Sequence, residues 1–159
     1  MSKAKGKGKG KSKGSECVQV MVRVRPLNKK EKNNGSTNVL KVERENGEIT
    51  IRKPNSNSRD TSKCFTYDAV FPPEVTQESV YEESGFHIVE SVSEGFNGTI
   101  FAYGQTGCGK TYTMMGPDPN DLVNKGIIPR TFGHIFKIIE TTTAKKFLVQ
   151  CSFIEIYNE

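Results

Sequence analysis

Residues 104–111, with the sequence GQTGCGKT, limit the fold of this chain more than any other segment. They follow a short apolar run, residues 99–103, which we expect to be a buried strand, and precede a helix expected to begin at Lys110. Glycines in such a turn let backbone N–H groups curl around phosphate oxygens without Cβ obstruction. The N-terminus of the following helix adds partial positive charge. The segment therefore predicts a phosphate-binding loop.

The residue types within this loop predict a nucleotide site with a metal ion. Lys110 would reach the β- and γ-phosphates, and the Thr111 hydroxyl would complete the shell of a Mg²⁺ ion. The alternative is an ordinary tight turn, which the position after a buried strand disfavours. The residues expected to bind the phosphates are Gly104, Gln105, Thr106, Gly107, Cys108, Gly109, Lys110 and Thr111.

The segments before the loop predict strands and one long helix. Valines at alternate positions in residues 17–24 favour a strand covered on both faces. Asn46-Gly47 predicts a small hairpin between residues 39–43 and 49–52. A short strand is expected at residues 64–67, followed by an amphipathic helix of about five turns from the N-cap Thr76 to residue 96.

The segments after the loop continue the alternation of helix and strand. Residues 117–125 are expected to be a loop, and Pro129 suits the first position of another helix. Residues 147–157, rich in apolar and β-branched side chains, predict a long strand. This order favours an α/β fold of the phosphate-loop type, with a mixed central sheet flanked by helices and a small N-terminal hairpin.

Charge and cysteine placement exclude several classes of protein. Of the 23 basic residues, six lie in residues 1–14, an acid-free lysine and glycine stretch that we expect to be a disordered tail. This tail either only aids solubility or tethers the protein to a polyanion. No apolar run approaches the roughly 20 residues of a membrane span, and we expect no secretory signal. The four cysteines form no zinc-binding pattern, which favours reduced thiols in the cytosol.

Six segments in chain order resemble the kinesin motor domain, from about Glu16 to the last residue. They are residues 22–28 (VRVRPLN), 65–71 (FTYDAVF), 95–103 (GFNGTIFAY), 113–114 (TM), 126–130 (GIIPR) and 153–159 (FIEIYNE). An unrelated phosphate-loop kinase would account for the loop but not for these six ordered matches. Residues 28–32 and 147–150 are most similar to the heteromeric kinesins of ciliary transport.

The resemblance implies a base-binding wall. Arg23, Arg25 and Pro26 would lie on the adenine side, with Tyr112 as the aromatic partner; guanidinium and ring stacking would hold the base. The alternatives are an exposed strand end for the arginines and packing on the sheet for Tyr112. Many family members carry serine, threonine or alanine where this chain has Cys108, a change between small residues.

The resemblance also implies a function: an ATPase with Mg²⁺ that couples hydrolysis to movement along microtubules, with Lys110 and Thr111 as catalytic residues. The parent protein would be dimeric or heteromeric through a coiled coil. It would act in the cytoplasm on the cytoskeleton, with the cilium as a candidate location, and would bind tubulin but no nucleic acid.

Residues 15–159 cover only the N-terminal part of such a domain. The serine- and arginine-bearing switch segment and the Asp-x-x-Gly switch of the family are absent from the sequence. We therefore expect the C-terminal half of the domain to be missing, and the chain alone to be aggregation-prone and without microtubule-stimulated turnover. The alternative is a non-motile nucleotide-binding or tubulin-tethering adaptor.

Overall fold

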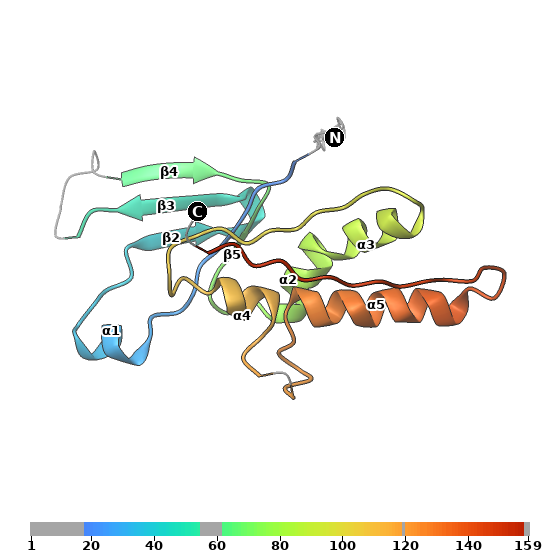
Figure 1. Cartoon of the computed structure of the whole chain (residues 1–159). Coiled ribbons are helices and arrows are strands. Elements are labelled where there is room, and N and C mark those ends of the chain that lie inside the picture. The colour runs from blue at the N-terminus through green and yellow to red at the C-terminus, as the bar shows by residue number, and fades with distance from the viewer. Residues whose placement is uncertain (1–17, 55–61, 119, 158–159) are drawn as a thin grey trace, which may run out of the picture. The chain divides into compact units, whose positions relative to one another are not determined.

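The computed structural model describes residues 18–54, 62–118 and 120–157 (Figure 1). Contacts divide the chain after Pro72 into two compact units. The tail expected over residues 1–14 and the last two residues of the 153–159 segment lie outside the described residues. No helix in the described ranges has the length and apolar character needed to cross a membrane.

The first unit contains two small sheets. Strand β1 (Met21–Arg23) pairs in parallel with β5 (Ala69–Phe71), whose Val70 and Phe71 are fully buried. Strands β2 (Leu40–Glu43), β3 (Glu48–Arg52) and β4 (Ser62–Thr66) form an antiparallel sheet in that order. Parallel and antiparallel pairing together with helices agree with the predicted α/β class.

The predicted hairpin is confirmed, and its turn has a clear steric cause. The chain makes a single 3₁₀ turn, η1 (Arg44–Asn46), before Gly47 takes the left-handed conformation with φ of 67°. A Cβ on Gly47 would collide with the carbonyl oxygen of Tyr67. Glycine is therefore required at this position both for its backbone angle and for space.

Strand β1 is shorter than the sequence predicts. Residues 17–24 were expected to be covered on both faces, yet Val18 and Val20 are 70% and 51% exposed and lie outside the strand. The strand pairing is limited to the three residues of β1 that lie opposite β5, because β5 itself is three residues long. Between β1 and β2 the chain forms α1 (Lys29–Asn33), a short helix that the sequence interpretation did not include.

The second unit is helical. It contains α2 (Gln77–Ser84), α3 (Phe86–Ser93), α4 (Lys110–Met114) and α5 (Ile127–Thr141). Helices α2, α3 and α5 contact one another, and α5 also contacts α4. The buried apolar side chains of this unit are Val80, Tyr81, Val89 and Ile127.

Two helix boundaries differ from the sequence prediction. The single helix expected over residues 76–96 is divided at Gly85, where a Cβ would lie 2.8 Å from the ring of Tyr81. The buried tyrosine ring therefore leaves no space for a side chain larger than glycine at the residue between the two helices. Helix α5 begins at Ile127, two residues before Pro129, and this proline remains within the first turn, where the missing N–H costs no hydrogen bond.

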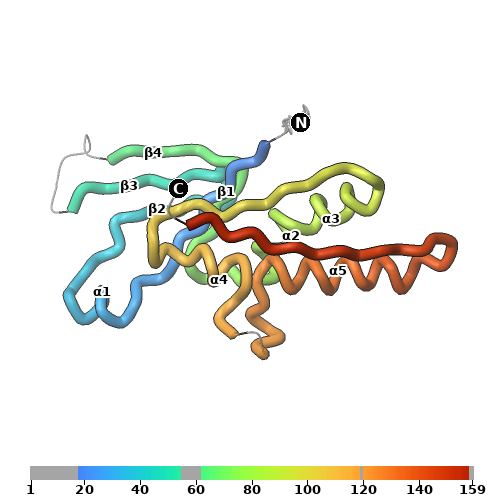
Figure 2. The backbone as a smooth tube through the Cα atoms, viewed as in Figure 1, coloured from blue at the N-terminus to red at the C-terminus, as the bar shows by residue number. Residues whose placement is uncertain are grey.

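Two predicted strands are not formed. Residues 99–103 and 147–157 are extended, as Figure 2 shows, but neither is a strand in the structure. The prediction that residues 99–103 are buried is also wrong, since Phe101 and Tyr103 are 80% and 93% exposed. Phe153 is likewise 93% exposed. Apolar composition marks a segment that can become a strand, but a strand needs a paired neighbour.

Candidate nucleotide site

The turn before α4 depends on glycine backbone angles. Gly104, Gly107 and Gly109 have φ of 151°, 79° and 104°, in the region that favours glycine. A Cβ on Gly104 would lie 2.6 Å from the Sγ atom of Cys108, so the loop closes tightly on itself. The Cys108 N–H donates to the Gln105 carbonyl at 3.1 Å. Glycine at these positions allows the positive φ angles and leaves the backbone N–H groups uncovered by side chains, as the binding of phosphate oxygens requires.

The side chain of Lys110 folds back over this turn. Its Nζ atom donates to the carbonyl oxygens of Gly104 at 2.8 Å and Gln105 at 3.2 Å. These two bonds hold a positive charge on the loop itself, at the N-terminus of α4, where the helix dipole is also positive. The arrangement therefore concentrates the charge that phosphate binding needs within one turn of chain.

Thr111 and Tyr112 follow in the first turn of α4, and both are exposed. The hydroxyl oxygen of Thr111 is a hard ligand of the kind that Mg²⁺ prefers. Tyr112 is 42% exposed, so its ring is not enclosed by the interior of the second unit. The residues present therefore fit a triphosphate with its magnesium ion: an open glycine backbone, a lysine and an exposed threonine hydroxyl.

The arginines expected to bind the base lie in the first unit. Arg23 ends β1 opposite Phe71 of β5. The guanidinium of Arg25 donates to both carboxylate oxygens of Glu31, at 2.7 and 2.6 Å, and to the carbonyl of Pro26 at 3.0 Å. The guanidinium of Arg25 is thus held at the start of α1, with 38% of the side chain exposed.

Glu31 is also the acidic partner of a capping box. Its backbone N–H donates to the side chain of Asn28, and the Asn28 N–H donates to the Glu31 carboxylate, each at 2.8 Å. The hydrogen bond from Arg25, with a further bond from the Asn28 backbone, lowers the pKa of Glu31 from 4.5 to about 2. The spacing Asn-x-x-Glu is the sequence signal that could have revealed this helix and this role for Glu31.

The two groups of predicted site residues belong to different units of the chain. Gly104 to Tyr112 form one continuous turn and helix start in the second unit, whereas Arg23, Arg25 and Pro26 belong to the first. Each group has local geometry suited to its expected role. Their joint action on one nucleotide is a prediction.

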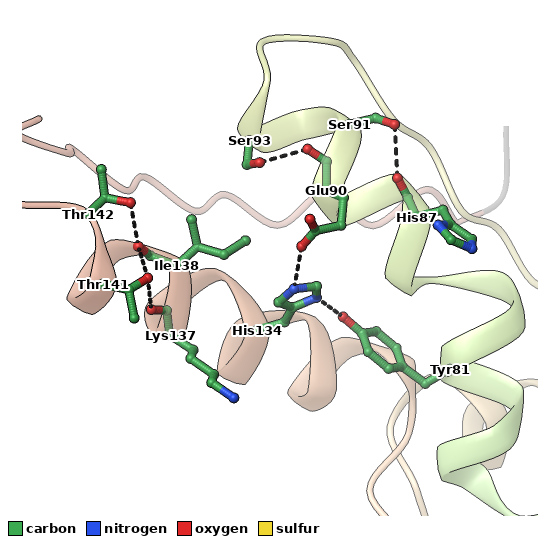
Figure 3. A network of polar contacts seen from close by, with 10 residues as sticks. All are labelled: Tyr81, His87, Glu90, Ser91, Ser93, His134, Lys137, Ile138, Thr141 and Thr142. Atoms are coloured by element: carbon green, nitrogen blue, oxygen red, sulfur yellow. Dashed lines mark hydrogen bonds and ion pairs between the residues drawn. The ribbon is translucent and has the colours of Figure 1, made fainter.

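A polar network ties three helices of the second unit together, as Figure 3 shows. The Tyr81 hydroxyl of α2 lies 2.8 Å from Nδ1 of His134 in α5, and His134 Nε2 lies 2.8 Å from the carboxylate of Glu90 in α3. Phe86 stacks on the His134 ring at 4.7 Å between centroids. Burial raises the pKa of Tyr81, so its phenol stays protonated and can donate to Nδ1.

A cavity of about 290 Å³ lies within the second unit. Apolar side chains of α3 and α5 and the extended segment before the loop form most of its lining, including Ile88, Val92, Ile100, Met114, Ile127 and Ile135. Gly98 also lines the cavity, and a Cβ there would collide with Ile88. Neither this cavity nor the polar network was anticipated from the sequence.

Comparison with known proteins gives a consistent family assignment. The family model described as the kinesin motor domain matches residues 23–159. The chain is 42% identical over 144 residues to Kinesin-like protein KIF3C of Bos taurus and 46% identical over 142 residues to Kinesin-like protein Klp68D of Drosophila melanogaster. Each alignment covers 89% of this chain but only 18% of the relative's length.

Proposed function

Because this chain belongs to the kinesin motor-domain family, we propose that it is the ATP-binding part of a microtubule motor. The observation that carries the proposal is the position of Lys110, whose ammonium group lies on the carbonyls of Gly104 and Gln105 in a glycine turn at a helix start. Phosphate oxygens are stronger acceptors than neutral carbonyls. A triphosphate would therefore compete for this lysine without moving it far.

Each residue of the turn has a proposed task. The backbone of residues 104–109 binds the phosphates, Lys110 neutralises charge on the β- and γ-phosphates, and the Thr111 hydroxyl binds Mg²⁺. Mg²⁺ held by the Thr111 hydroxyl would supply charge stabilisation to the phosphates during hydrolysis. Arg23, Arg25, Pro26 and Tyr112 hold the adenine by stacking and by guanidinium contacts.

The parent protein, in this proposal, couples ATP hydrolysis to movement along microtubules in the cytoplasm. It assembles as a dimer or heteromer through a coiled coil, and the resemblance to ciliary-transport kinesins adds the cilium as a site of action. The 159-residue chain tested alone binds nucleotide but shows no microtubule-stimulated turnover. Its sequence contains neither of the family's two switch segments, which position water and sense the γ-phosphate.

Nucleotide binding to Lys110→Ala provides the test. Titration of the chain with a fluorescent ATP analogue and Mg²⁺ should give a dissociation constant that rises about tenfold to a hundredfold in the variant, because a charge-assisted contact is lost. Lys137→Ala, which removes an exposed lysine from α5, is the matched control and should bind like the wild type.

Equal affinity of the wild type and Lys110→Ala for the nucleotide would contradict a nucleotide site at this loop.

Microtubule cosedimentation separates the motor proposal from a tethering adaptor. Binding that survives Lys110→Ala, falls steeply with salt and requires residues 1–14 would favour the adaptor. In the parent protein, Lys110→Ala should abolish microtubule-stimulated ATPase activity.

A further inference from the structure

Apart from Tyr81, Gln77 is the only buried residue among the described ones whose side chain carries a polar group, and 3% of its surface is exposed. Its Nε2 group donates to two backbone carbonyls that are distant in sequence. One is the carbonyl of Tyr112 in α4, at 2.6 Å, and the other is the carbonyl of Asn124, at 3.2 Å. A single amide group at the start of α2 thus joins the helix after the phosphate loop to the segment that precedes α5.

These two carbonyls lie at the neck of the loop formed by residues 116–126. The Gly126 N–H donates to the Met115 carbonyl at 3.1 Å. A Cβ on Gly116 would lie 2.7 Å from the Asn124 oxygen, and a Cβ on Gly126 would lie 2.5 Å from the Met114 oxygen. The two sides of the neck are therefore in direct backbone contact, and a displacement of one side moves the other.

The Tyr112 carbonyl connects this neck to the proposed ATP site. It belongs to the residue directly after Thr111, in a helix of only five residues, and it also accepts the N–H of Gly116 at 2.9 Å. We propose that Gln77 is a positioning residue that fixes the C-terminal end of α4 and thereby holds Lys110 and Thr111 in place for the phosphates. The inference rests on the proposed function and extends it to a residue outside the loop.

The chemistry of the side chain suits this task. A carboxamide carries two N–H donors on one nitrogen, so it can serve two carbonyl acceptors at once. A carboxylate would place negative charge against both carbonyls, and an apolar side chain would leave them without this donor. Arg130 of α5 separately donates to the carbonyls of Lys125 and Val123, at 3.0 and 2.8 Å. The body of the loop therefore keeps its own anchor when Gln77 is changed.

Two variants of the full chain test the proposal. Gln77→Glu keeps the shape of the side chain but replaces the N–H donors with a carboxylate. Gln77→Met keeps a similar volume and removes the donors without burying a charge. Amide hydrogen exchange should become about tenfold faster at Gly116 and Gly126, whose N–H groups bond to the Tyr112 and Met115 carbonyls, and stay unchanged at Val89 of α3. The dissociation constant for a fluorescent ATP analogue with Mg²⁺ should rise about five- to tenfold. Glu78→Gln, at the exposed neighbouring position, is the matched control.

Three results would overturn the positioning role. The first is unchanged exchange at Gly116 and Gly126 in both variants. The second is an equal rise of the exchange rate at Val89, which would indicate general destabilisation. The third is an unchanged dissociation constant for the nucleotide despite faster exchange at Gly116 and Gly126. Failure of the proposed function would look different: the wild type itself would bind no nucleotide, and Lys110→Ala would not differ from it. The exchange rates alone then decide whether Gln77 holds the neck.

Discussion

Arg25 and Glu31 form a two-point ion pair in which Nη1 and Nη2 of the guanidinium each donate to one carboxylate oxygen, at 2.7 and 2.6 Å. The same carboxylate accepts the backbone N–H of Asn28, at the N-terminus of α1. One acidic side chain thus fixes both a helix start and the orientation of an arginine. Two parallel bonds define the plane of a guanidinium, which is what stacking on a base requires.

The pH dependence of this ion pair follows from the pKa of Glu31, which is lowered from 4.5 to about 2. A carboxyl group with a depressed folded-state pKa contributes stability that is fully present above 4.5 and is lost as the pH falls toward 2. We expect the NMR carboxyl shift of Glu31 to titrate near pH 2. The stability difference between the wild type and Glu31→Gln should be constant from pH 5 to 7 and shrink below 4.5. A Glu31 titration near 4.5 would contradict the structure.

Glu31→Gln also tests the contribution of Arg25 to nucleotide binding. Glutamine serves in a capping box as glutamate does, so α1 should remain capped while the charge that orients Arg25 is lost. We expect ATP-analogue affinity to fall about three- to tenfold, in line with the loss of a modest preorganising contact. Glu45→Gln, at an exposed residue of the 3₁₀ turn, is the control. Unchanged affinity would show that Arg25 does not act on the base.

A pair of glycine substitutions separates backbone strain from crowding. Gly109 has φ of 104° and Gly133 lies within α5, and neither would bring a new Cβ within 4 Å of other atoms. Gly109→Ala should therefore destabilise the protein by about 1–2 kcal/mol and impair nucleotide binding, because alanine disfavours positive φ. Gly133→Ala should stabilise it by up to about 1 kcal/mol, since alanine favours a helix. Urea unfolding measures both, and opposite signs are the expected result.

His134→Phe tests the polar network that joins α2, α3 and α5. Phenylalanine can keep the stacking on Phe86 but cannot bond to Tyr81 or Glu90. We expect a loss of about 1–3 kcal/mol in the free energy of unfolding, because the hydroxyl of the buried residue Tyr81 loses a partner. Lys137→Ala on the exposed face of the same helix should change the stability by less than about 0.5 kcal/mol. A neutral effect of His134→Phe would show that the network does not stabilise the helices.

The features that the sequence by itself determined are those set by short-range sterics. Glycine spacing in residues 104–111 predicted a turn that leads into a helix, and the structure has this turn with positive φ at three glycines. Asn46-Gly47 predicted the hairpin for the same reason, since glycine accepts the backbone angle that the turn needs. The six ordered segments resembled the kinesin motor domain, and the family comparison confirms that assignment.

Only the tertiary structure decided features that depend on contacts between residues distant in the chain. The burial of Gln77 and its bonds to residues 35 and 47 positions away leave no local pattern in the sequence. The close approach of the Tyr81 ring to Gly85 is likewise a tertiary feature, and the strands expected over residues 99–103 and 147–157 lack the pairing that strands require. Apolar periodicity reports which side chains can be buried, whereas burial itself is decided by the partners that the fold places beside them.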